Sequence, residues 1–175
     1  MSNPLSILCI FISFILSFNS YAAKGVYQTS SQFISNAFLG KEAEVKMLWL
    51  STEDKRSIAD ILQHKYSRMR IRYWQEGEET VWILDEIGKE KPITIGVHIK
   101  EHRINHFKVL TFRESRGHEV RHDFYAKQFL NAELLQNNLL SNHIDGITGA
   151  TMSVSATKKT ARLALWLHAK VINHS

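Results

Sequence analysis

Alternating apolar and polar residues in the middle of the chain predict a group of β-strands. Apolar residues occupy every second position from Ile93 to Ile99, which is the period of a half-buried strand. Residues 104–112 continue as a second strand after a short turn. Upstream, residues 69–73 and 80–84 alternate around a glycine-containing turn and predict a hairpin. Because short turns join these strands, we expect a mostly antiparallel sheet.

Other segments repeat their apolar residues at helical spacing and predict helices beside this sheet. Residues 31–38 form the first helix, which Gly40 ends. A strand at 45–50 leads to a second helix, which Ser51–Asp54 begins with a capping-box pattern. The residues of this second helix that we expect to pack on the sheet are Ile58, Ile61 and Leu62.

The longest helical pattern closes the chain. Ser153 or Ser155 is expected to cap this helix, and Lys158, Lys159 and Arg162 are expected on its outer side. Its inward positions are Val154, Ala161, Ala164, Leu165, His168 and Val171 or Ile172.

Less regular segments fill the remainder. A charged loop is predicted at 85–92, and short helical or irregular pieces at 123–129 and 132–140. The core residues expected in these two pieces are Phe124, Phe129, Leu134 and Leu135. The arginines at 68, 70 and 72 alternate along a strand, which indicates its solvated face.

Together these patterns indicate a single small α+β domain. The chain has 175 residues and only two prolines, and no linker rich in Pro, Gly or Ser divides it. We therefore expect a mostly antiparallel sheet with packed helices and a C-terminal helix.

The N-terminus has the pattern of a secretory signal peptide. Leu5 to Phe18 is an apolar run too short to span a bilayer comfortably, and Ser20-Tyr21-Ala22 supplies small residues at cleavage spacing. We assign 1–22 as signal peptide and 23–175 as the mature domain. Since no Lys or Arg precedes the run, retention as an uncleaved anchor stays an alternative. The single cysteine, Cys9, would leave with the signal, so the mature chain would hold no disulfide.

Export changes how the net charge of +5 is interpreted. Nucleic acid is a poor partner outside the cytoplasm, whereas acidic proteins, membrane surfaces and anionic cofactors stay open. The sequence has neither a Gly-x-Ser-x-Gly motif nor a Walker loop. It therefore lacks the residues expected of a serine hydrolase or a nucleoside triphosphatase of those types.

The segment Asp145-Gly146-Ile147-Thr148-Gly149-Ala150-Thr151 is the strongest candidate site. Its two glycines let the backbone adopt positive φ and approach a bulky group closely, and the small Ala150 leaves space beside Thr151. A threonine hydroxyl is thereby placed at the start of the last helix, as a cofactor seat requires.

This segment resembles the flavinylation motif, Asp-x-x-Ser/Thr-Gly-Ala-Ser/Thr, of the FMN-binding domain family. That family includes the FMN-carrying subunits of sodium-pumping and Rnf-type electron-transfer complexes. The resemblance implies that a separate periplasmic flavin transferase esterifies the FMN phosphate to Thr151. It also implies that Glu114, Gly117 and His118 lie in a loop against the isoalloxazine ring. The cofactor-binding residues predicted in this way are Asp145, Thr148, Gly149, Ala150, Thr151, Glu114, Gly117 and His118.

An FMN phosphate on Thr151 would keep a negative charge, which the free N–H groups at the helix start are suited to receive. Asp145 is expected to hold the turn by bonding backbone amides or to be recognised by the transferase, and Thr148 to make a local hydroxyl bond. Arg113 and Arg116 flank the loop that the resemblance places at the ring, where a cation stabilises reduced flavin. No catalytic residue is assigned.

Nine histidines raise the question of a metal site. His98, His102 and His106 are spaced by four, but they fall across two strands and a turn, where that spacing does not converge. His118 and His122 are also four apart, without a Cys-x-x-Cys-His or His-Glu-x-x-His motif. We therefore predict no metal site.

The predicted function is that of an exported periplasmic flavoprotein, which carries FMN covalently on Thr151 and relays electrons. The resemblance implies three partners: the flavin transferase, a membrane-bound electron-transfer donor and a periplasmic redox acceptor. Two alternatives stay open, a small flavin-dependent reductase acting on a soluble acceptor and a non-redox binding or assembly protein that keeps the fold.

Overall fold

The computed structural model describes residues 25–173, so the predicted signal peptide at 1–22 lies outside the described residues. Five strands form one antiparallel sheet in the order β1-β2-β3-β4-β5, each beside its neighbour in sequence. The strands are β1 (Glu44–Trp49), β2 (Arg70–Glu76), β3 (Glu79–Ile87), β4 (Pro92–Lys100) and β5 (Arg103–Phe112). The predicted antiparallel sheet and its hairpin are confirmed.

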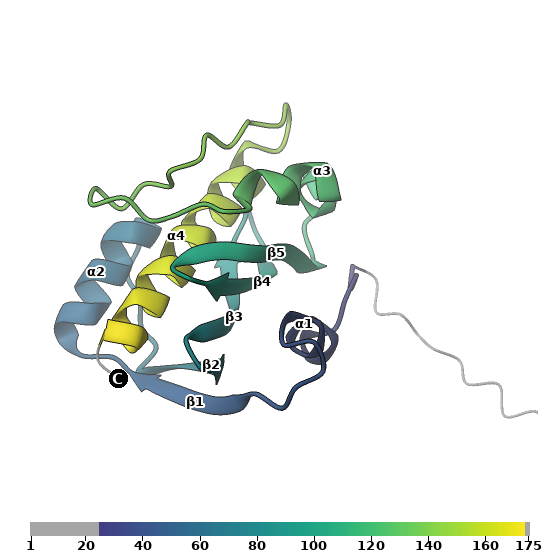
Figure 1. Cartoon of the computed structure of the whole chain (residues 1–175). Coiled ribbons are helices and arrows are strands. Elements are labelled where there is room, and N and C mark those ends of the chain that lie inside the picture. The colour runs from purple at the N-terminus through teal and green to yellow at the C-terminus, as the bar shows by residue number, and fades with distance from the viewer. Residues whose placement is uncertain (1–24, 174–175) are drawn as a thin grey trace, which may run out of the picture.

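Helices lie on both faces of the sheet (Figure 1). The long α4 and the shorter α2 pack on one face, where they share the main core with the sheet. The small α1 packs on the other face. The helices are α1 (Ser30–Ala37), α2 (Thr52–Leu62), α3 (Asp123–Ala126) and α4 (Thr151–Asn173), with single turns η1 (His118–Arg121) and η2 (Lys127–Phe129). The expected α+β class with a C-terminal helix is confirmed.

The start of α2 is fixed by the capping box that the sequence predicts. The Ser51 hydroxyl accepts the Asp54 N–H at 3.1 Å, and the Asp54 carboxylate accepts the Ser51 N–H at 2.8 Å. Lys170 of α4 forms an ion pair with the same carboxylate at 2.7 Å. The predicted inward residues of α2 are buried, and the main neighbour of the helix is α4.

Strand β4 is buried on both faces in its middle, although its alternation predicts only one buried face. Gly96 and His98, on the face expected to be solvated, are both buried. The reason is α1, because a Cβ on Gly96 would lie 2.7 Å from the ring of Phe33. The small glycine therefore lets α1 pack directly on the strand.

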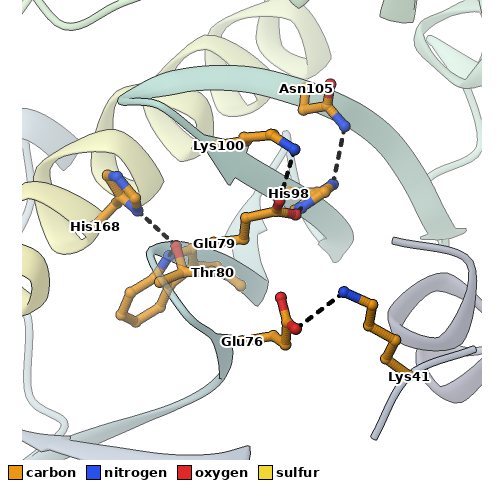
Figure 2. Close-up of polar contacts among 9 residues, drawn as sticks. Lys41, Glu76, Glu79, Thr80, His98, Lys100, Asn105 and His168 are labelled. Atoms are coloured by element: carbon orange, nitrogen blue, oxygen red, sulfur yellow. Dashed lines mark hydrogen bonds and ion pairs between the residues drawn. The ribbon is translucent and has the colours of Figure 1, made fainter. Parts of the chain in front are cut away.

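His98 is hydrogen-bonded at both ring nitrogens (Figure 2). Nε2 lies 3.0 Å from the Glu79 carboxylate and Nδ1 lies 3.2 Å from the Asn105 amide nitrogen. Lys100 pairs with Glu79 at 2.8 Å. Burial lowers the pKa of His98 and outweighs the opposing effect of Glu79. Within residues 25–173, no group of three or more His, Cys, Asp or Glu side chains is placed to hold a metal.

Several boundaries and core assignments differ from the prediction. β3 continues to Ile87, so the charged loop shortens to residues 88–91. Phe124 is 62% exposed and Leu135 is 45% exposed, whereas Phe129 is fully buried, since short irregular segments offer no periodicity to orient side chains. Among the described residues, none of the helices is long and apolar enough to span a membrane.

Candidate functional site

Thr151 is the first residue of α4, and its side chain is exposed. The preceding turn is closed by the Ala150 N–H, which donates to the Ile147 carbonyl at 2.9 Å. Gly149 has the predicted positive φ, +81°, whereas Gly146 is not in that region. Helix α4 therefore begins at the threonine, two residues before the earlier of the serines expected to cap it.

A second loop packs against this turn. Gly117 has φ +82°, and a Cβ at this position would lie 2.6 Å from the Ser153 hydroxyl and 3.3 Å from the Ala150 Cβ. Only glycine allows that approach without displacing one of the two segments. The two motifs that the sequence singles out, around 114–117 and 145–151, therefore meet in space.

Between them lies a cavity of about 520 Å³, which we call the polar cleft. One wall is formed by Gly149–Ser153, the other by Glu114–Arg116, and Lys89 and Glu90 of the loop between β3 and β4 contribute to its lining. The first N–H groups of α4 have no intrahelical acceptor, because a helix leaves its first turn unpaired. The cleft thus combines a helix N-terminus with cationic side chains.

Glu114 holds one wall of the polar cleft in place. Its carboxylate accepts the backbone N–H groups of Lys89 at 2.5 Å, Glu90 at 2.6 Å and Lys91 at 2.9 Å. Burial raises the pKa of Glu114, but the three N–H groups outweigh that effect and the pKa is lowered. This contact anchors the loop between β3 and β4, a role that the sequence does not reveal.

The two arginines that flank this loop have different surroundings. Arg113 donates to the Pro92 carbonyl at 3.0 Å and to the Thr94 hydroxyl at 2.9 Å, so it is fixed on β4. Arg116 is exposed and lines the polar cleft. Of the two, Arg116 is the cation placed to meet an anionic ligand.

Thr151 also borders a second cavity of about 420 Å³, which we call the apolar cleft. Leu139, Leu140, Ile144 and Val154 supply its apolar lining, together with the side chains of Lys158 and Arg162. The Lys158 ammonium donates to the Ile144 carbonyl at 3.4 Å.

Arg162 is less exposed than the sequence predicts. Its guanidinium donates to the Ile61 carbonyl at 3.3 Å, while its buried Nε has no partner within the described part of the chain. Burial lowers its pKa. Periodicity places this residue on the outer side of α4. It does not reveal the hydrogen bond to Ile61 or the apolar cleft that Arg162 shares with residues 139–144.

The remaining predicted site residues lie at the surface. The Asp145 carboxylate lies 3.4 Å from the His143 ring and makes no bond to a backbone amide within residues 25–173, so its expected role in holding the turn is not seen. Thr148 is exposed and makes no local hydroxyl bond among the described contacts. His118 is exposed on η1 and lines neither cleft.

A buried pair positions the first half of α4. The Tyr125 hydroxyl lies 2.7 Å from the Thr157 hydroxyl, which donates to the Val154 carbonyl at 2.8 Å. Burial raises the pKa of Tyr125 to about 12. This contact ties α3 to the helix that carries Thr151.

A comparison with known protein families finds a match for the segment that forms this site. The family model described as "FMN-binding domain" matches residues 88–165, from the loop before β4 into α4. This chain therefore contains an FMN-binding domain. The matched segment holds both walls of the polar cleft and the turn before Thr151. No curated protein and no solved structure matched the chain.

The residues of this FMN-binding domain fit the cofactor. FMN has an anionic phosphate and a flat aromatic ring, and Thr151 stands where a helix N-terminus, Arg116 and two clefts adjoin. The buried Arg162 Nε without a partner adds a hydrogen-bond donor beside the apolar cleft. The protein is thus a flavoprotein by its domain and by the chemistry of its site.

Proposed function

We propose that the FMN of this flavoprotein is bound covalently to Thr151 and that the protein relays electrons between a membrane-bound donor and a periplasmic acceptor. The observation that carries the proposal is the exposed Thr151 hydroxyl at the mouth of both clefts. A bound FMN supplies reversible uptake and release of one or two electrons.

The attachment step transfers a flavin phosphate to a hydroxyl oxygen. Thr151 loses its hydroxyl proton, its oxygen bonds to the phosphorus of an activated flavin nucleotide, and the group that activated that phosphate leaves. The product carries FMN less one water. Because Asp145, Thr148 and Gly149 are also exposed, the turn is open to a separate transferase.

After attachment, the chain positions the linkage. The first N–H groups of α4 would receive the negative charge of a phosphate on Thr151, and Arg116 would add a positive charge from the opposite wall. We propose that the ring lies in the polar cleft beside residues 114–117. There, Glu114 fixes the loop between β3 and β4.

Tethering suits an exported carrier, since FMN is scarce outside the cytoplasm and a bound cofactor is not lost between electron transfers. The relay needs the flavin near the surface, where donor and acceptor proteins can approach it. The exposure of Thr151 and the openness of the turn support this proposal.

The first test is the mass of the protein exported together with a flavin transferase. The peptide that contains Thr151 should gain FMN less one water, and Thr151→Ala should lose the gain. Thr151→Ser is the matched control, because it keeps a hydroxyl at the same position of the turn and should keep the modification. An unmodified Thr151 in the wild type would overturn covalent attachment.

The relay is tested separately with the flavinylated protein. Membranes supplied with a respiratory substrate should bleach its flavin absorbance, and an added oxidised periplasmic redox protein should restore that absorbance. Steady-state turnover of a small soluble acceptor, with no bleaching by membranes, would instead identify a reductase.

A further inference from the structure

The face of the sheet that carries α1 is only partly covered. Phe33 and Phe38 of the α1 segment pack with Val81 and Leu110 over the β3–β5 half of the sheet. Among the described elements, α1 makes its main sheet contacts with β3 and β4, and on β2 it is Trp74 that packs against this cluster.

Apolar and cationic side chains share the β1–β2 part of this face. Val45, Met47 and Trp49 alternate along β1, and in the register Met47 is opposite Arg72 and Trp49 is opposite Arg70. Directly opposed residues of an antiparallel pair point to the same face. We call these five residues the sheet-edge patch.

The apolar members of the sheet-edge patch are unusually exposed. Trp49 is 64% exposed, Val45 58% and Met47 38%. A shallow hollow of about 330 Å³ extends between Met47, Arg72 and Ile83. Exposed aromatic and aliphatic side chains that cluster in this way indicate an interaction surface.

The patch carries positive charge that the fold leaves unbalanced. The Arg70 guanidinium lies over the Trp49 ring at 5.3 Å, and neither Arg70 nor Arg72 forms an ion pair within residues 25–173. Arg68 lies nearby, 3.8 Å from Asp85. A ligand that complements this area must therefore be anionic as well as able to accept an indole ring.

We propose that the sheet-edge patch binds the surface of a membrane that contains anionic phospholipids. Tryptophan side chains favour the interface between water and lipid, and arginines close to it are attracted by phosphate headgroups. A second copy of the chain would instead bring the arginines of two patches together, which like-charge repulsion disfavours.

This binding would orient the flavin site. Thr151 begins α4 at the end beside α3, whereas β1 lies near the opposite end of that helix (Figure 1). A protein bound to a membrane through β1 therefore turns the Thr151 turn toward the aqueous phase. The inference does not depend on flavin attachment, because it concerns a different surface.

The test measures binding of the full mature protein to vesicles. Vesicles of phosphatidylglycerol mixed with phosphatidylcholine should bind it, pure phosphatidylcholine vesicles should bind it far less, and added salt should release it. The double variant Arg70→Gln/Arg72→Gln should lower the partition coefficient roughly 30-fold, since each basic residue near an anionic surface contributes about 1 kcal/mol.

The matched control is Arg56→Gln/Lys65→Gln, which removes the same charge from exposed positions on α2 and just after it. It should retain most of the binding. Trp49 provides a second measurement. Brominated lipids should quench part of the tryptophan fluorescence of the wild type, and this quenching should be absent in Trp49→Phe. The proposal is overturned if the wild type ignores anionic vesicles at low salt, or if both double variants weaken binding equally. Self-association without vesicles that Trp49→Gln abolishes would overturn it in favour of a second copy of the chain.

Discussion

Protonation of the buried His168 should destabilise the fold at acidic pH. His168 lies on α4 and is 1% exposed, and its Nδ1 is 2.8 Å from the Thr80 hydroxyl (Figure 2). That hydroxyl oxygen accepts the Trp82 indole N–H at 2.9 Å. The chain of bonds is satisfied when His168 is neutral, with Thr80 donating to Nδ1 and the ring proton on Nε2.

The magnitude follows from the pKa. Burial, and then the nearby His102 and His98, lower the pKa of His168 from 6.5 to about 4. The unfolded chain binds this proton near pH 6.5, whereas the folded chain resists it until about pH 4. The stabilisation is therefore complete above the unfolded pKa and is lost as pH falls between these values. The loss amounts to about 3 kcal/mol of unfolding free energy.

Urea denaturation at about pH 7 and about pH 4 measures this loss. His168→Asn keeps an acceptor for Thr80 but cannot titrate, so its unfolding free energy should fall by about 3 kcal/mol less than that of the wild type. Carboxylates with lowered pKa, such as Glu79, also lower the unfolding free energy at acidic pH. Their contribution is the same in the wild type and in the variant, so it cancels when the two proteins are compared. His122→Asn, at an exposed position, is the control and should behave as the wild type. The reasoning is refuted if His168→Asn shows the same pH dependence as the wild type.

Three further substitutions test the flavin site. Gly117→Ala should destabilise the fold by about 1–3 kcal/mol and slow flavinylation, because the new methyl group collides with Ser153. Gly40→Ala is the control in urea denaturation. Gly40 has a similar φ but open space around it, so this variant measures the backbone strain alone. Tyr125→Phe should lower the unfolding free energy by about 1 kcal/mol, and an unchanged urea midpoint would contradict the buried hydrogen bond. Glu114→Gln should cost about 1 kcal/mol and speed amide hydrogen exchange in the loop at 88–91, whereas unchanged exchange would show that the carboxylate does not hold that loop.

Local patterns were sufficient for most elements of the fold. The strands follow from alternation, because successive side chains point to opposite faces of the sheet and the larger core lies on one of these faces. The start of α2 follows from Ser51 and Asp54, which satisfy each other's N–H groups without help from distant residues. The capping residues are three positions apart, and the alternation can be recognised within a single strand.

The errors arise where a distant segment decides the environment. Gly96 and His98 are buried because α1 covers them, and nothing in the pattern of β4 encodes that cover. Arg162 is likewise partly buried, because its guanidinium donates to the Ile61 carbonyl of α2. The motif at 145–151 predicts the cofactor attachment site. The contact of Gly117 with Ser153 depends on tertiary packing and emerges only from the structure.

The covalent attachment and the electron transfer that we propose would make opposite demands on Thr151. A transferase needs the hydroxyl exposed, whereas a carrier needs its cofactor held at a fixed position. The turn meets both demands by dividing its residues: Thr148, Gly149 and Thr151 face solvent, while Ala150 and Ser153 are buried against the loop at Gly117. A substitution on the exposed side should therefore alter recognition by the transferase without unfolding the protein, whereas one on the buried side should disturb stability and attachment together.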